Sequence, residues 1–259
     1  MSKVFTIISH YRSGTSYFCQ LIKKNFENVN MNFEIYSSPY QINIFTRRKV
    51  EAELGFANEE LRNYAKEFPL DYLDCIINHN SKSQNVTGFK LFHNHLDWEK
   101  AEMVIKRTDF VIFLHRNFLD IYISFIKARL IGKFARVDTS NTKIQFDSKE
   151  FEEIENNYNT WMQKTRALVE KQNIPFVNIH YSTFHKMDFD EKIDFLKTLL
   201  ESKLQLPIII GNSSLNQRPI RLLFKQDQSK SYNESIENYK EFEDYILNFT
   251  NYNLNLESF

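Results

Sequence analysis

The stretch Val4-Phe5-Thr6-Ile7-Ile8-Ser9-His10-Tyr11-Arg12-Ser13-Gly14-Thr15-Ser16 decides the fold. Its first half, residues 4–9, is a short apolar run rich in β-branched residues, which is typical of a buried strand. A turn over residues 10–14 then leads into a helix that we expect over residues 15–25. A strand that turns through Ser-Gly into a helix directs several free backbone N–H groups toward one point, where the helix dipole adds partial positive charge. The stretch therefore predicts an anion-binding turn.

The side chains of this turn add to its affinity for anions. Arg12 supplies a fixed positive charge, and Ser13, Thr15 and Ser16 supply hydroxyl donors. The turn lacks the lysine and the first glycine of the G-x-x-x-x-G-K-[ST] loop, so the sequence disfavours a nucleoside triphosphatase. The alternative interpretation is an ordinary strand-to-helix turn in which serine and threonine cap the helix.

The rest of the chain alternates strands with helices. We expect strands over residues 31–35, 86–92, 110–114 and 174–179, helices over 97–106, 118–134, 148–172, 190–200 and 234–249, and a mainly helical region over 38–80. This alternation predicts an α/β fold with a mostly parallel sheet of about five strands, right-handed crossovers and helices on both faces. With no repeat or linker to divide it, the chain is expected to form a single domain over residues 1–259. In such folds the ligand binds beyond the carboxyl ends of the strands.

Composition excludes several classes of protein. The 259 residues carry 33 Lys and Arg against 33 Asp and Glu. This neutral balance argues against a nucleic-acid partner, because domains that bind nucleic acids usually carry a net positive charge. No run approaches the ~18 apolar residues of a transmembrane helix, and residues 1–9 lack the pattern of a signal peptide. We therefore expect a cytoplasmic protein. Cys19 and Cys75 are too few for a disulfide framework or a four-cysteine zinc site.

A second candidate anion site follows the apolar strand at 110–114. Arg116 lies just past the carboxyl end of that strand, and Ser124 lies two turns into the next helix. Taken alone, Arg116 would be a surface ion-pair residue and Ser124 an unremarkable helix residue. Because parallel strands end at the same edge of a sheet, this site and the Arg12 turn together describe a ligand with two separated phosphates.

At this point the chain resembles the sulfotransferases that use 3′-phosphoadenosine 5′-phosphosulfate (PAPS), above all the bacterial trehalose- and glycolipid-type enzymes and related carbohydrate sulfotransferases. Five motifs occur in the order of that family. They are residues 11–16 as the 5′-phosphosulfate loop, residues 87–91 as a Gly-x-Lys-Leu strand, His115-Arg116 with Ser124 as the 3′-phosphate motif, Tyr181 after the last core strand, and residues 223–229 as a C-terminal Lys/Arg-Gln segment. The resemblance implies a three-layer fold of the P-loop-containing nucleotide-hydrolase type.

The resemblance also implies a reaction and its site. PAPS would donate its sulfuryl group to a hydroxyl of a carbohydrate or glycolipid, leaving 3′-phosphoadenosine 5′-phosphate, and no metal is implied. The residues that would bind the nucleotide are Arg12, Ser13, Gly14, Thr15 and Ser16 at the phosphosulfate, Arg116 and Ser124 at the 3′-phosphate, and Tyr181, Lys225 and Gln226 around the nucleotide. Arg12 would in addition stabilise the charge of the leaving phosphate oxygen. The sequence leaves open whether the protein contacts a membrane surface and whether it forms a homodimer.

The general base for the acceptor hydroxyl has more than one candidate. The resemblance points to Glu34, which we expect at the end of the second strand, where related enzymes have a glutamate in a Gly-Glu-Pro segment. The alternative for Glu34 is an ordinary surface carboxylate. His93 and His95, just beyond the third strand, are the rival bases. His-x-His could also suggest a metal, but the sequence identifies no ligand partner for it.

Two further functions compete with sulfuryl transfer. One is a nucleotide-dependent kinase or other phosphotransferase on the same scaffold, and the other is a nucleotide- or glycan-binding module without catalysis. The basic run at 127–136 could attract an anionic ligand, or it could be the solvated face of a helix end. The acceptor pocket is expected in segments 35–80 and 134–150, which carry no readable specificity code.

Overall fold

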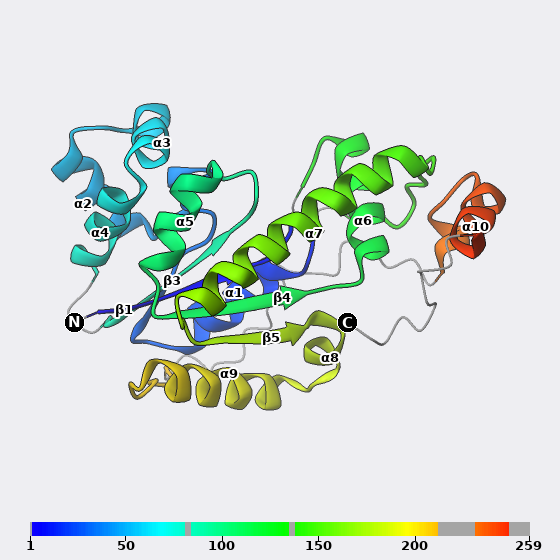
Figure 1. The fold of residues 1–259 in the computed structure, drawn as a ribbon. Coiled ribbons are helices and arrows are strands. Elements are labelled where there is room, and N and C mark those ends of the chain that lie inside the picture. The colour runs from blue at the N-terminus through cyan, green and yellow to red at the C-terminus, as the bar shows by residue number, and fades with distance from the viewer. Residues whose placement is uncertain (1, 81–83, 135–137, 212–230, 249–259) are drawn as a thin grey trace.

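The computed structural model describes residues 2–80, 84–134, 138–211 and 231–248, and it contains a five-stranded parallel sheet with helices on both sides (Figure 1). In chain order the elements are β1 (Lys3–Ile8), α1 (Thr15–Asn25), β2 (Val29–Met31), η1 (Pro39–Gln41), α2 (Ile44–Leu54), α3 (Asn58–Glu67), α4 (Pro69–Asn78), β3 (Val86–Leu91), α5 (Trp98–Lys106), β4 (Phe110–His115), α6 (Phe118–Ile131), α7 (Ser148–Lys171), β5 (Phe176–His180), α8 (Tyr181–Lys186), α9 (Phe189–Leu204), η3 (Tyr232–Glu234) and α10 (Tyr239–Asn248).

The sheet confirms the predicted fold class. Its strands run in the order β2-β3-β1-β4-β5, and every pairing among them is parallel. β1 is central, and the chain builds first toward β2 and β3 on one side and then toward β4 and β5 on the other. This reversal of direction beside β1 is a topological switch point, where ligands of open α/β sheets bind outside the carboxyl ends of the strands. The architecture is that of a three-layer P-loop-like fold.

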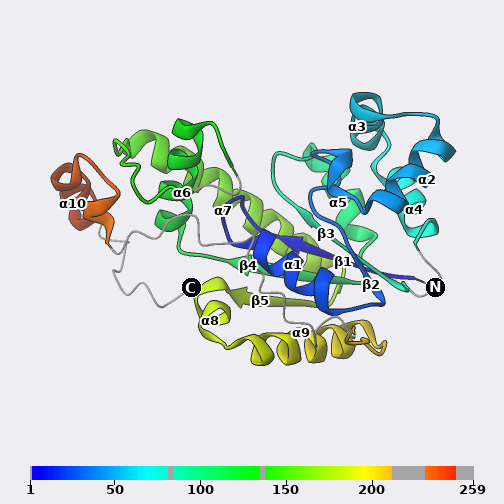
Figure 2. The same ribbon diagram turned by 180° about the vertical axis from the view of Figure 1, so that it is seen from behind.

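Two apolar cores cover the two faces of the sheet because side chains along a strand alternate between the faces. In β1, Val4 and Ile8 face one core, while Phe5 and Ile7 face the other. The first core also contains side chains of α4, α5, α6 and α7, and the second contains side chains of α1 and α9. Figures 1 and 2 accordingly show α9 on the opposite side of the sheet from α5 and α7.

Gly88 lets three strands pack closely at the centre of the sheet. It pairs with Phe5 of β1 and Met31 of β2. A Cβ atom at this position would lie 2.3 Å from Phe5 Cζ and 2.6 Å from Met31 Sδ, well inside van der Waals contact. The Phe5 ring therefore occupies space that only a glycine leaves open.

Capping side chains mark the starts of α2, α5, α6, α7 and α9. Asn117 accepts hydrogen bonds from the N–H groups of Leu119 and Asp120 at the start of α6, and Asp188 forms a capping box with Glu191 at the start of α9. The sequence predicts that α6 extends to residue 134, but Gly132, with φ of 69°, ends it at Ile131.

The largest error of the sequence prediction concerns the second strand. The sequence predicts it over residues 31–35, but β2 spans Val29–Met31. Asn32 donates to the Gly88 carbonyl and the Phe33 carbonyl accepts from the Lys90 N–H, but the Phe33 N–H turns away from the sheet to the Gln41 carbonyl of η1. Glu34 therefore lies in a loop rather than at a strand end.

Smaller differences concern the second half of the chain. The fifth strand begins two residues later than the sequence predicts, α8 follows it directly, and α9 extends to Leu204. The last helix, predicted from residue 234, begins at Tyr239. Residues 232–234 form the 3-10 helix η3, and Ile236 forms an isolated β-bridge with Ile144 before the helix begins.

Among the described residues, no helix combines the length and apolar character needed to cross a bilayer.

We predict that Gly88→Ala destabilises the protein by about 1–3 kcal/mol, the usual cost of forcing an extra methyl group into a close-packed core. Urea unfolding monitored by far-UV circular dichroism would measure it. Gly211→Ala is the matched control, because a Cβ there would meet only the side chain of Glu27, at 2.9 Å. Equal stability of Gly88→Ala and the wild type would contradict this account of the sheet centre.

Candidate active site

The turn between β1 and α1 has the geometry of an anion site. Arg12 and Gly14 both have left-handed backbone conformations, with φ of 68° and 81°. Gly14 is the N-cap of α1 and has no side chain with which to cap the first N–H groups of the helix. Ser13 Oγ is buried and has no hydrogen-bond partner among the described residues. Unpartnered donors beside a helix N-terminus favour an anion at this point.

Tyr181, the first residue of α8, covers this turn. A Cβ atom at position 14 would lie 2.1 Å from Tyr181 Cε2, so the ring rests directly on the Gly14 backbone. Gly14 is thus required both by its positive φ and by the close approach of the ring. This contact ties the end of β5 to the turn after β1, although the two are far apart in sequence.

Arg12 bridges the turn to α6. Its Nε and Nη2 atoms donate to Ser124 Oγ over 3.0 and 2.9 Å, and its Nη1 donates to the Phe134 carbonyl over 2.7 Å. The Arg12 guanidinium therefore connects the turn after β1 to α6 and to the segment that follows α6. Ser124, which the sequence groups with Arg116, contacts Arg12 in this structure.

Arg116 lies on the other side of the same turn. Its Nη1 donates to the Arg12 carbonyl over 2.8 Å, and its Nε lies 3.6 Å from Asp120 Oδ2. The guanidinium carbon lies 5.4 Å from the centre of the Tyr181 ring, in a cation–π arrangement. Two arginines that the sequence assigns to separate anion motifs are therefore in direct contact at the carboxyl edge of the sheet.

Lys90, near the end of β3, supplies a third positive charge. Its side chain is only 2% exposed, and its Nζ lies 2.9 Å from Glu34 Oε1. The same Nζ donates to Ser16 Oγ over 3.1 Å and to Thr15 Oγ1 over 3.4 Å. Lys90 thus connects the Glu34 carboxylate to the first turn of α1. A buried ammonium group is stable only with such partners.

Glu34 is held as a carboxylate by its neighbours. Burial on its own would raise the pKa of Glu34, but His95 and Lys90 outweigh it and lower that pKa to about 2. His95 Nε2 lies 3.7 Å from Glu34 Oε2, while its Nδ1 accepts from the Phe92 N–H over 3.3 Å. This hydrogen bond leaves the proton of neutral His95 on Nε2, facing Glu34. Burial lowers the pKa of His95, so neutral imidazole is its ordinary form.

His93 belongs to a different cluster. Its ring stacks on that of His10 with centroids 5.2 Å apart, and it lies 5.7 Å from the ring of Tyr11. Burial lowers the pKa of His10 to about 4 and also lowers that of His93. His10 Nε2 and His93 Nδ1 are buried without a hydrogen-bond partner among the described residues. Both rings are therefore neutral, with unused polar atoms beside the turn.

The structure thus brings together most of the residues that the sequence singles out. Lys225 and Gln226 lie outside the described residues. The basic run at 127–136 is not a uniformly solvated helix face, because Lys127 is buried and donates to Ser235 Oγ over 2.9 Å.

The sequence motifs do not predict that Lys90 and His10 belong to the site. Lys90 falls within the Gly-x-Lys-Leu segment, but the motif by itself gives it no function. The signal that could have identified it is a lysine inside an apolar strand. His10 follows β1 directly, and nothing in its local sequence indicates that its ring is buried.

Comparison with protein-family models finds no matching family, and comparison with curated proteins finds no match. The chemistry of this site therefore rests on its geometry and on the motifs in the sequence.

We predict that Glu34→Gln costs about 3 kcal/mol of stability at pH 7, and that most of this cost is lost as the pH falls toward the folded pKa. The carboxyl pKa falls from 4.5 to about 2 on folding, and lowering a pKa by one corresponds to about 1.4 kcal/mol. A lowered carboxyl pKa stabilises the fold fully above the unfolded value and loses this effect as the pH falls toward the folded one. Urea unfolding of both proteins between pH 7 and pH 2.5 would test this.

The control is Glu59→Gln, which removes an exposed carboxylate paired with Arg62 at 3.1 Å. We expect this change to cost less than about 1 kcal/mol, as surface ion pairs usually do. A stability difference for Glu34→Gln that stays constant with pH would show that the carboxylate charge is not what stabilises the fold.

Proposed function

We propose that this protein is a PAPS-dependent sulfotransferase that sulfates a hydroxyl of a carbohydrate or glycolipid. The observation that carries the proposal is that Arg116 and Lys90 contact the turn and first helical turn at the N-terminus of α1, where Arg12 also lies, at the switch point of a parallel sheet. Three cations and a helix N-terminus suit a ligand with several anionic groups. The five sequence motifs shared with PAPS-dependent enzymes select the donor from the anions that such a site could bind.

In the proposed complex, the 5′-phosphosulfate lies in the turn at residues 12–16, next to Lys90. The 3′-phosphate binds the guanidinium of Arg116 and the hydroxyl of Ser124. In this structure the Ser124 hydroxyl is instead hydrogen-bonded to Arg12. Arg12 would release Ser124 and turn toward the 5′-phosphosulfate. Tyr181 rests on both Gly14 and Arg116, so it would contact the nucleotide between the two anionic groups.

The reaction is an in-line displacement at sulfur. The acceptor hydroxyl oxygen forms a bond to sulfur while the bond from sulfur to the 5′-phosphate oxygen breaks, and the phosphate leaves with that electron pair. Arg12, Lys90 and the α1 N–H groups would stabilise the charge that grows on the leaving oxygen. Such transfer demands mainly positioning and charge stabilisation, which this set of residues can supply.

Glu34 would take the proton of the acceptor hydroxyl. With a pKa of about 2 the carboxylate is a weak base. Lys90, however, contacts both Glu34 and the Ser16 hydroxyl of the turn, so a sulfonate bound there would compete for its charge. As Lys90 shifts toward the sulfonate, Glu34 loses its partner and its pKa rises. Donor binding would thereby activate the base.

We predict that 3′-phosphoadenosine 5′-phosphate binds to the wild type without added metal and in the presence of EDTA, and that Arg116→Ala weakens binding roughly 10- to 100-fold, the value of a charged hydrogen bond or two. Isothermal titration calorimetry measures both. The control is Arg107→Ala, which removes an arginine on the protein surface that pairs with Asp74 at 3.0 Å.

Calorimetry with ATP, with and without Mg²⁺, distinguishes a sulfotransferase from the competing phosphotransferase. Binding of ATP with Mg²⁺ but not of the bisphosphate would refute the sulfotransferase proposal and favour a phosphotransferase. Tight bisphosphate binding, with no sulfation of any acceptor tested, would favour a binding module without catalysis.

We predict that Glu34→Gln lowers sulfation of trehalose from labelled PAPS at least ~100-fold, the ordinary contribution of a general base, while bisphosphate affinity changes only a few-fold. Glu34→Asp, which retains a carboxylate on a shorter side chain, is expected to recover part of the rate. His93→Gln is the matched control, because His93 is the rival base and packs against His10 instead of Lys90. Loss of turnover in His93→Gln with normal turnover in Glu34→Gln would reverse the assignment.

A further inference from the structure

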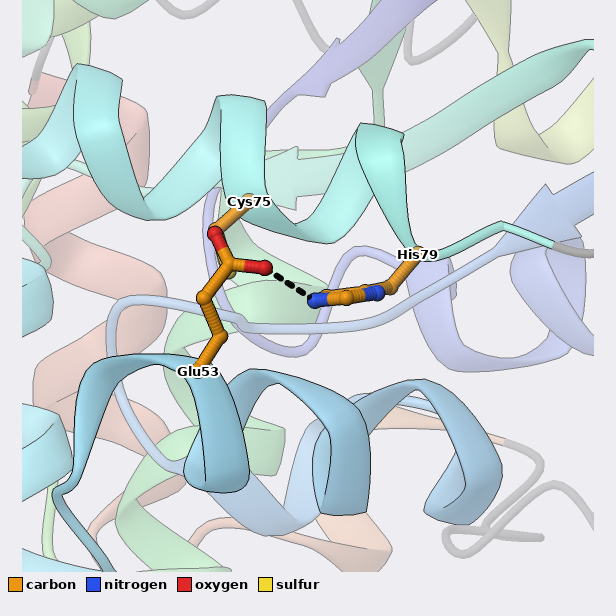
Figure 3. Close-up of side chains that lie close together, drawn as sticks. All are labelled: Glu53, Cys75 and His79. Atoms are coloured by element: carbon orange, nitrogen blue, oxygen red, sulfur yellow. Dashed lines mark hydrogen bonds and ion pairs between the residues drawn. The ribbon is translucent and has the colours of Figure 1, made fainter.

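The packing of α2 against α4 brings together three side chains that ligate metals. Glu53 lies in the last turn of α2, Cys75 lies in α4, and His79 is the C-cap residue of α4 (Figure 3). One ligand atom from each of the three lies within 4.8 Å of the other two. Cys75 and His79 are four residues apart and so project from the same side of α4, and Glu53 reaches them from the neighbouring helix.

We propose that Glu53, Cys75 and His79 bind a divalent ion of the Zn²⁺ class and that this ion clamps α2 to α4. A sulfur, an imidazole nitrogen and a carboxylate oxygen form a donor set that Zn²⁺ accepts, whereas Mg²⁺ and Ca²⁺ prefer oxygen ligands alone. The fourth ligand would be water, since the side chains of Glu53 and His79 are 52% and 23% exposed.

The distances require only a small adjustment. With bond lengths of about 2.0–2.3 Å, the ligand atoms of a tetrahedral zinc site lie roughly 3.3–3.8 Å apart. Glu53 Oε2 and His79 Nε2 are already 2.6 Å apart and share a hydrogen bond. The ion would take the place of the proton in that bond, which moves to His79 Nδ1 or to water, and it would displace the Cys75 thiol proton to water. The exposed Glu53 side chain has room to rotate.

The ends of the helices provide a second, independent reason for a cation here. A helix C-terminus carries partial negative charge, which is usually balanced by basic residues in the last turn. α1, α5 and α7 have such residues, including Lys106 and Lys171. Neither α2 nor α4, both of which are fully described, has a basic residue in its last turn, and both end at this cluster. A bound cation would neutralise the two helix ends together.

A reactive cysteine is the competing interpretation of Cys75. Cys75 is buried and lies beside the Glu53 carboxylate, surroundings that do not activate a thiol as a nucleophile. The cluster also lies apart from the candidate active site. In both views α2 and α4 lie beside the start of β1, whereas β4 runs toward α6 at the other end of the molecule (Figures 1 and 2). A structural ion fits this position better than a catalytic thiol.

The test uses the full chain, purified without a histidine tag and treated with a chelator. We expect one Zn²⁺ per chain by equilibrium dialysis and elemental analysis, and a higher midpoint of thermal unfolding with Zn²⁺ than with EDTA. Co²⁺ in place of Zn²⁺ should give the near-ultraviolet charge-transfer band of a thiolate ligand. Cys75→Ser should abolish that band, and His79→Ala should weaken Zn²⁺ binding by about 100-fold or more, since even residues that only support ligands cost roughly 10- to 100-fold.

Cys19→Ser is the matched control, because Cys19 is buried in the opposite core, in contact with α1 neighbours rather than with this cluster. It should keep the Co²⁺ band. Glu53→Gln, a change at an exposed position that leaves the helices able to fold, should also weaken binding. Absence of stoichiometric Zn²⁺ binding to the wild type, or Zn²⁺ binding and a Co²⁺ band that persist in Cys75→Ser and His79→Ala, would overturn the proposal. Neither outcome bears on bisphosphate binding, so the two proposals fail separately.

Discussion

The parallel pairing of β1 with β3 and β4 is the constraint on which the candidate site depends. Ile7 lies opposite Lys90 on one side and Ile112 on the other, so the three strands reach the same edge together. The Ser9 hydroxyl then donates to the Leu114 carbonyl over 2.6 Å, which joins the two strand ends. Every cation of the site is attached to one of these ends. The geometry of the sheet, rather than any single motif, therefore concentrates the positive charge.

Each of these cationic side chains has a partner inside the protein. Lys90 is paired with Glu34, Arg116 with Asp120, and the Arg12 guanidinium with the oxygens of Ser124 and Phe134. Each of these partners is one that an anionic ligand could replace. A site held by replaceable internal partners can remain folded without its ligand and still bind a polyanion, because the desolvation cost of the buried charges has been met on folding.

The remote cluster of Glu53, Cys75 and His79 shows how differently the two ends of the molecule are built. At the carboxyl edge of the sheet, a helix N-terminus and basic side chains favour anions. Between α2 and α4, two helix C-termini and a carboxylate favour a cation. The sequence points to the helical segment between β2 and β3 as a source of acceptor specificity. That segment carries a candidate metal site whose ligands come from two separate helices.

Local sequence determined much of this protein. The β-branched run at 4–9, the Ser-Gly turn after it and the alternation of strands with helices are sufficient to predict a parallel α/β sheet and an anion-binding turn at Arg12. These features are readable because they depend on residues close together in the chain. The pairing of Lys90 with Glu34, the contact of Tyr181 with Gly14 and the grouping of Cys75 with Glu53 were decided only by tertiary structure. Each joins segments separated by a crossover, a loop or several strands, and no local periodicity records which side chains such connections bring into contact.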